Sequence, residues 1–237
     1  MRSWEPCKVS SITTSGVAMK KILKDNGLTI VLLLLFLGSI VGHGLTGWHF
    51  QNQQLQDHGE QPITLLAFLK DPQFLSTVFE NWESEFLQMS AYVVLTAFLF
   101  QRGSAESADP DERPRADDTA ARTTKAGGPA PLHRGAMVRW VYGRSLGIVL
   151  LTLFVGSFLM HWYFSAKEAA EEASRHGAPA LTPLQYLTGA QLWFESFQNW
   201  QSEFLSTAVI VVLSIFLRQE GSPESKPVAA AHSETGA

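Results

Sequence analysis

Two glutamates and two histidines are the residues of this sequence best placed to do chemistry. Glu85 and Glu203 stand 118 residues apart in matching contexts, and so do His43 and His161. Two imidazoles with two carboxylates form an acceptable ligand set for a divalent metal. The same groups could titrate protons, since histidine changes charge near neutral pH and burial raises the pKa of a glutamate. They could also be purely structural, each glutamate pairing locally and each histidine anchoring its helix at an interface.

Polar residues at helical spacing extend the two acids into a stripe. At 100° per residue, the face of Glu85 also carries Asn81, Gln88, Tyr92 and Thr96. Glu80 and Glu83 fall on the other side of that helix, and their counterparts 118 residues later are Gln198 and Gln201. Ionisable groups in membrane spans usually face the bundle interior, because lipid cannot solvate them. The sequence therefore predicts a candidate polar cluster of Glu85, Glu203, Asn81, Asn199, His43 and His161. No His-x-x-x-His spacing accompanies it, so no metal ligands are assigned.

Apolar segments must position these side chains. Leu28–Leu45 and Leu146–Phe164 contain 18 and 19 residues without Asp, Glu, Lys or Arg. Such runs are typical of membrane-spanning helices. The second of these segments is internal, which argues against a cleaved signal peptide at the first.

Two shorter apolar segments complete the set. Phe86–Phe100 and Phe204–Leu217 contain 15 and 14 residues, about five fewer than the roughly 20 that a span requires. Extension to Trp82 and Trp200 supplies the missing length, and both tryptophans are natural anchors at a membrane interface. The sequence thus predicts four transmembrane helices.

An internal repeat relates the two halves of the chain. Ten of sixteen positions are identical between residues 28–43 and 146–161, and seventeen of thirty-two between 76–107 and 194–225. The most specific match is Asn81-Trp82-Glu83-Ser84-Glu85-Phe86-Leu87 against Asn199-Trp200-Gln201-Ser202-Glu203-Phe204-Leu205. We therefore expect an all-α membrane protein made of two tandem two-helix repeats. Because each repeat crosses the membrane twice, both should have the same orientation.

The distribution of charge gives the orientation and the domain boundaries. Of the 18 Lys and Arg residues, 15 lie at the chain ends or in the central connection, which places these regions in the cytoplasm. The central connection and the tail have no apolar face and are predicted to be disordered. The expected domains are a disordered segment 1–19, a first membrane repeat 20–103, a disordered cytoplasmic linker 104–138, a second membrane repeat 139–221 and a disordered tail 222–237.

The two outer connections have helix signals of their own. Asp71-Pro72 is typical of a helix start, and the helix is expected to run from Pro72 to about Gln101. The short apolar segments 62–69 and 183–187 are expected to form stubs of helix along the outer interface.

Composition excludes several functional classes. The chain has 237 residues, 18 Lys+Arg and 22 Asp+Glu, so no basic excess exists to neutralise the phosphates of a nucleic acid. Its one cysteine excludes an internal disulfide and a cysteine-cluster metal site. No phosphate-binding glycine loop, nucleophile elbow or Ser/His/Asp arrangement is visible. The sequence indicates no enzyme and no cofactor.

Several motifs together resemble a family of bacterial integral-membrane proteins known only as a domain of unknown function. The resemblance covers roughly residues 20–225 and rests on Lys24-Asp25-Asn26-Gly27-Leu28, Gly44-Leu45-Thr46-Gly47-Trp48, the segment 79–89 and Gln101-Arg102-Gly103-Ser104-Ala105-Glu106-Ser107. It implies a multi-pass protein of the bacterial inner membrane and no particular activity. The lipid bilayer is the expected partner, with a homo-oligomer as a further expectation. The expected role is a structural or interaction module. The alternative is a small transporter, channel or proton-coupled carrier that uses the paired intramembrane glutamates.

Overall fold

The computed structural model describes residues 11–111 and 129–236, and these residues are all-helical, with no strand. The chain divides into two compact units, Met1–Phe74 and Leu75–Ala237, which are described separately. The disorder predicted for residues 1–10 and 112–128 lies outside the described residues.

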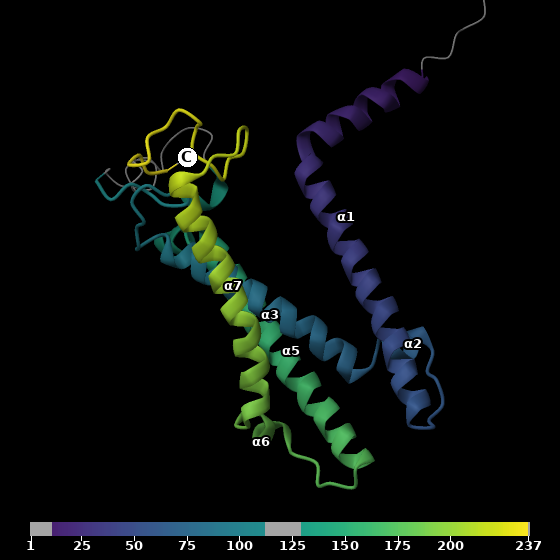
Figure 1. Cartoon of the computed structure of the whole chain (residues 1–237). Coiled ribbons are helices and arrows are strands. Elements are labelled where there is room, and N and C mark those ends of the chain that lie inside the picture. Colours follow the sequence, from purple (N-terminus) through teal and green to yellow (C-terminus); the bar gives the residue numbers. More distant parts are fainter. Residues whose placement is uncertain (1–10, 112–128, 237) are drawn as a thin grey trace, which may run out of the picture. The chain divides into compact units, whose positions relative to one another are not determined.

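The first unit is dominated by one long helix, α1, which spans Ser11–Asp57 (Figure 1). Its regular geometry is interrupted at Asn26, where φ is −131° and ψ is 16°. Beyond Met19, α1 is long and apolar enough to cross a membrane. Its apolar residues from Leu28 to Leu37 are largely exposed, as expected for a surface that lipid covers.

A short helix, α2 (Leu65–Phe68), packs against the last turns of α1. Trp48 Nε1 and Asn52 Nδ2 of α1 both donate to the carbonyl oxygen of Ile63, at 2.7 and 3.1 Å. A Cβ atom at Gly47 would lie 2.9 Å from the Phe68 ring, so the missing side chain lets the two helices approach closely. The helix stub expected within residues 62–69 is therefore present.

The second unit contains the remaining helices. They are α3 (Pro72–Leu95), which begins at the end of the first unit, the 3-10 turn η2 (Ala130–His133), α4 (Ala136–Tyr142), α5 (Ser145–Arg175), α6 (Pro183–Leu187) and α7 (Ala190–Phe216). The predicted start of α3 is observed, with Asp71 Oδ1 accepting from the backbone N–H of Gln73 at 3.0 Å. The α6 stub also forms where it was expected, and Thr182 and Gln185 make a capping box at its start. It contacts both α5 and α7, whose ends it joins in Figure 1.

Within the described residues, three helices are long and apolar enough to cross a membrane: Met19–Asp57 of α1, α5 and α7. Helix α3 is not one of them. It ends at Leu95, before the predicted end near Gln101. The Thr96 hydroxyl donates to the Tyr92 carbonyl at 2.8 Å, and the chain then turns through residues 96–98. The helix therefore includes only the first ten residues of the apolar segment 86–100.

Local geometry recurs 118 residues apart. Helices α3 and α7 begin at Pro72 and Ala190. The irregular Asn26 in α1 corresponds to Arg144, the residue that precedes α5 and has φ −122° and ψ 8°. Positive φ angles are found at two glycine pairs with this separation, Gly59 with Gly177 and Gly103 with Gly221.

The segments that follow α3 and α7 share a hydrogen-bond pattern. Ser107 Oγ accepts from the Gln101 N–H at 2.9 Å, and Ser225 Oγ accepts from the Gln219 N–H at the same distance. Both serines also donate to the carbonyl of the next residue. The chain directly after each of these two helices therefore forms a hydrogen-bonded turn.

The end of the chain, for which the composition predicts disorder, takes a defined path over residues 222–236. Lys226 is 1% exposed, and its Nζ donates to the carbonyl oxygens of Ala231, His232 and Glu234 at 2.9–3.1 Å. The segment then reaches the turn after α3, where the Gly236 N–H donates to Ser104 O and the Gly103 N–H donates to Thr235 Oγ1, each at 2.9 Å. The C-terminal segment thus connects the ends of α3 and α7.

Candidate functional site

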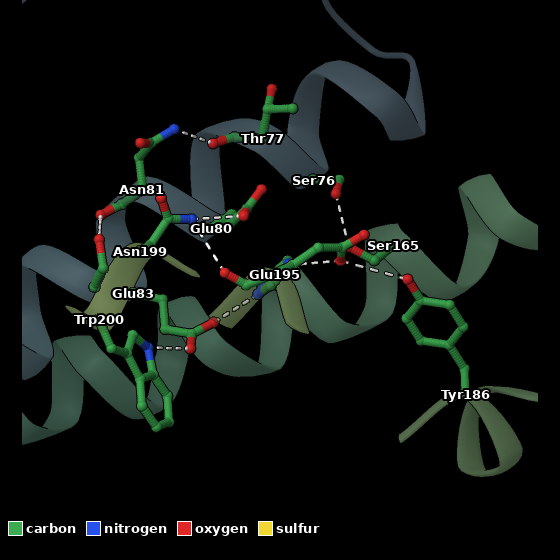
Figure 2. Close-up of polar contacts among 12 residues, drawn as sticks. Ser76, Thr77, Glu80, Asn81, Glu83, Ser165, Tyr186, Glu195, Asn199 and Trp200 are labelled. Atoms are coloured by element: carbon green, nitrogen blue, oxygen red, sulfur yellow. Dashed lines mark hydrogen bonds and ion pairs between the residues drawn. The ribbon is translucent and has the colours of Figure 1, made fainter. Parts of the chain in front are cut away.

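A buried ion pair lies at the centre of the second unit. Glu83 of α3 and His161 of α5 are both 0% exposed, and Glu83 Oε2 lies 2.6 Å from His161 Nδ1. The other carboxylate oxygen of Glu83 accepts from Trp200 Nε1 of α7 at 2.9 Å. Each oxygen of one buried carboxylate therefore binds a different helix, and Glu83 links α3, α5 and α7 (Figure 2).

Further polar contacts follow the same α3–α7 contact. Asn199 Nδ2 donates to Glu80 Oε1 at 2.5 Å, and Gln88 Nε2 donates to Thr207 Oγ1 at 2.5 Å. Both bonds join α3 to α7. Hydrogen bonds of this kind hold membrane helices together, because lipid offers the polar groups no other hydrogen-bond partner.

A second carboxylate faces the other side of the histidine ring. Glu195 Oε2 of α7 lies 3.6 Å from His161 Nε2, which is too far for a hydrogen bond. Tyr186 of α6 donates to the same oxygen at 3.5 Å, and Gln191 Nε2 donates to the other at 3.1 Å. Ser165 and Ser76 form a neighbouring bond of 2.7 Å between α5 and α3. We call Glu80, Glu83, His161 and Glu195 the buried acid–histidine cluster.

Burial changes the acidity of groups at the edge of this cluster. The pKa of Glu80, which precedes the predicted span, is raised mainly by burial, with the negative charges of Glu195 and Glu83 adding to the effect. His161 and the hydrogen bond from Asn199 oppose this shift. The pKa of the Tyr186 hydroxyl is also raised, first by burial and then by the charge of Glu195. Both groups are therefore held toward their neutral forms.

The structure separates the residues of the predicted stripe. Asn81 and Glu85 are exposed, and Asn81 Nδ2 donates to the carbonyl of Thr77 on its own helix. Glu203 is half-buried, and the charge of Glu85 acts on it. The two acids were expected to face each other in the bundle interior. Instead, Glu85 is exposed and Glu203 is half-buried. The packed face of α3 is turned toward Glu83, because α5 and α7 meet α3 on that side.

Other predicted residues have different surroundings. His161 and Asn199 belong to the contacts described above. His43 lies in the first unit, with its ring centroid 5.1 Å from that of Phe74. The Trp82 ring packs edge-on against Phe79 at 5.5 Å, and Trp200 binds Glu83. No group of three or more His, Cys, Asp or Glu side chains within residues 11–111 and 129–236 is arranged to hold a metal ion.

Sequence reasoning missed Glu80, Glu83 and Glu195. The predicted sites are residues that recur 118 positions apart, whereas these acids correspond to Gln198, Gln201 and Thr77. Their presence in only one copy was itself a usable signal. The two segments otherwise have many identical residues. An acid in one segment opposite a neutral residue in the other therefore marks a position whose surroundings differ between them.

A second, smaller polar site lies at the other end of α3. The Tyr92 hydroxyl donates to Glu106 Oε2 at 2.6 Å, and the carboxyl group of Glu106 also acts on Glu224 of the C-terminal segment. The pKa of Glu224 is raised, chiefly by the neighbouring carboxyl group of Glu106.

Comparisons with known proteins give a family and no activity. A family model described as a domain of unknown function, DUF6766, matches residues 19–237. Comparison with curated proteins finds no match, and comparison with solved structures finds none either.

Proposed function

The chain belongs to the DUF6766 family of unknown function, and from this premise we propose that it is an integral membrane protein that serves as a non-enzymatic structural or interaction module. The observation that carries the proposal is the Glu83 carboxylate, fully buried and bound by His161 on α5 and Trp200 on α7. A carboxylate closed off by intramolecular donors joins helices. It offers no open position to a substrate.

The proposed arrangement has four spans in two tandem repeats of the same orientation, with both termini and the central linker in the cytoplasm. The three apolar helices support the membrane location. The recurrence of helix starts and capped turns 118 residues apart supports the tandem repeat. The excess of Lys and Arg at the chain ends and in the linker supports the orientation in a bacterial inner membrane. The exposed apolar side chains of α5 and α7 would contact lipid or a second copy of the chain.

Cysteine labelling tests the number of spans. On a Cys7→Ser background, single cysteines replace exposed residues in the two outer connections (Glu60 and Ala178) and beside the inner helix ends (Arg134 and Glu220). An impermeant maleimide added to intact cells should label the first pair, while the second pair should react only after permeabilisation. Labelling of Glu60→Cys and Ala178→Cys from opposite sides would contradict the four-span arrangement.

A proton-coupled carrier that uses Glu85 and Glu203 is the second candidate. The observation in its favour is that the charge of Glu85 acts on the half-buried Glu203, so an acidic pair lies at the edge of the α3–α7 contact. Purified protein in vesicles with an internal pH-sensitive dye tests it. The carrier hypothesis requires a proton flux that falls to the level of protein-free vesicles in the Glu85→Gln, Glu203→Gln double variant. Glu220→Gln, at an exposed acid outside the helices, is the control. A structural module shows no such flux in any of them.

A further inference from the structure

The charges within the buried acid–histidine cluster do not balance. Three carboxyl groups, Glu80, Glu83 and Glu195, surround a single imidazole, that of His161. The charged groups that act on Glu80 are His161, Glu195 and Glu83, and none of them is a lysine or arginine. With a neutral imidazole and three ionised acids, the cluster would carry three negative charges in a largely buried place. Burial of charge without a partner is strongly unfavourable, and such groups normally become neutral.

One atom in the cluster lacks the hydrogen bond that its burial requires. His161 is 0% exposed, and its Nε2 has no hydrogen-bond partner. Glu195 Oε2 lies 3.6 Å from this nitrogen. Since Nδ1 shares a proton with Glu83 at 2.6 Å, a neutral ring would direct the Nε2 lone pair at a carboxylate oxygen. Two acceptors would then face each other, one on a fully buried ring and one on a Glu195 side chain that is 26% exposed. A proton between them would turn this repulsion into attraction.

We propose that the buried acid–histidine cluster is a proton-binding site that holds two protons beyond the one on His161 Nδ1. One lies on His161 Nε2 and faces Glu195. The other lies on the Glu80 carboxyl group. Together they reduce the charge of the cluster from three negative to one negative, and the remaining charge is divided among groups that receive donors.

The hydrogen bonds decide which acid carries the second proton. Glu83 accepts from His161 and from Trp200, so each of its oxygens has a donor. Glu195 accepts from Tyr186 and Gln191 and faces the imidazolium. Glu80 accepts one side-chain bond, from Asn199. It is the least compensated of the three, and burial raises its pKa.

The surrounding titratable groups agree with this assignment. Helix α3 contributes Glu80 and Glu83, α5 contributes His161 and Glu168, α6 contributes Tyr186 and α7 contributes Glu195. The charge of Glu168 acts on Tyr186 and adds to the negative side of the balance. Among the described residues, each of these titratable groups other than His161 is an acid or a phenol, so the surroundings favour retention of protons.

The pH dependence has a definite sign. The pKa of Glu80 is higher in the folded protein than in the unfolded chain. The stabilising contribution of the neutral carboxyl group is therefore complete below its unfolded pKa, near 4.3, and is lost as the pH rises through the folded pKa. We expect the folded protein to lose stability on alkalinisation as α3 and α7 come to share uncompensated negative charge.

Infrared spectroscopy of the full-length protein in lipid nanodiscs tests the proton directly. At neutral pH the wild type should show the C=O stretch of a protonated carboxylic acid that shifts in heavy water. Glu80→Gln should lower the intensity of this band by the share of one carboxyl group, and Glu85→Gln, at an exposed acid of the same helix, should retain the full intensity. On unfolding in unbuffered detergent, wild type should release about one more proton per chain than Glu80→Gln.

Two results would overturn the proposal. One is a wild-type spectrum without a protonated carboxyl band at neutral pH, which is decisive even if no variant folds. The other is a folded Glu80→Gln protein that retains both the full wild-type intensity of the band and the wild-type proton release. A glutamine at position 80 should also flatten the loss of stability between neutral and alkaline pH, whereas a purely steric role of Glu80 would shift the whole curve equally. Neither measurement depends on the number of spans, so the proposed topology can fail independently.

Discussion

Glu83→Ala is expected to lower the free energy of unfolding by about 3–5 kcal/mol, the usual cost when one partner of a buried ion pair is removed. The substitution leaves His161 Nδ1 and Trp200 Nε1 without an acceptor at a place where His161 is 0% exposed. A neutral bond between membrane helices averages only about 0.6 kcal/mol, because the separated groups find other partners. The complete burial of Glu83 and His161 argues for the larger figure.

Gln201 of α7 provides the matched control for Glu83. It stands 118 residues later in a similar segment and is exposed, so Gln201→Ala should change stability by no more than about 0.5 kcal/mol. Thermal or denaturant unfolding of the purified protein in one detergent measures both variants. Glu83→Gln should fall between them, since it keeps an acceptor for Trp200 but places an amide beside His161. Equal stability of Glu83→Ala and wild type would show that the ion pair does not hold the three helices together.

Gly103→Ala is expected to detach the C-terminal segment from the end of α3. Gly103 has a φ of +85°, a conformation that costs an L-residue about 1–2 kcal/mol. In addition, its new Cβ would lie 2.6 Å from the carbonyl oxygen of His232, a backbone atom that cannot rotate away. Relief of this collision requires the whole segment to move, which breaks the bonds from Gly103 to Thr235 and from Gly236 to Ser104.

Gly221→Ala separates the two causes. Gly221 has a φ of +80°, but its added Cβ would meet nothing within 4 Å. The Gly221→Ala variant therefore has the free-energy cost of a positive φ angle but no steric collision. Hydrogen exchange of residues 227–236 should become fast in Gly103→Ala and stay close to wild type in Gly221→Ala. If both variants exchange alike, the contact between the C-terminal segment and the turn after α3 contributes nothing to the attachment of that segment.

Helix starts and apolar spans could be predicted because their causes are local. Asp71 followed by Pro72 supplies a cap and a preset φ angle, and α3 begins there. The uncharged run Leu146–Phe164 lies wholly within α5. The length of α3 could not be predicted in the same way. Its apolar run continues to Phe100, but the chain leaves the helix at Thr96, where the hydroxyl donates to the Tyr92 carbonyl. The Gln101 N–H then donates to Ser107 Oγ in the following turn.

The buried acid–histidine cluster could not be predicted from the residues that recur 118 positions apart. Glu85 and Glu203 recur at matching positions of the two halves and were predicted for that reason. The cluster instead pairs Glu83 of the first half with His161 of the second. Which face of α3 is buried is decided by the contacts of α5 and α7. An asymmetric contact between similar halves cannot be read from either half by itself.

The C-terminal segment shows a different limit of composition. Its few apolar residues predict disorder, because apolar burial normally offsets the entropy of ordering a chain. The described path relies instead on polar contacts, above all the ammonium group of Lys226 and three carbonyl oxygens. Arg218 contributes in the same way, with its guanidinium bound to Ser214, Ile215 and Ala230.

The attachment of Gly236 to Ser104 affects how the protein can be tagged. A fluorescent or enzymatic reporter joined after residue 237 would start beside a packed helix end, where its bulk competes with the bonds of Thr235 and Gly236. Reporters intended to leave the bundle undisturbed should follow a long flexible spacer there.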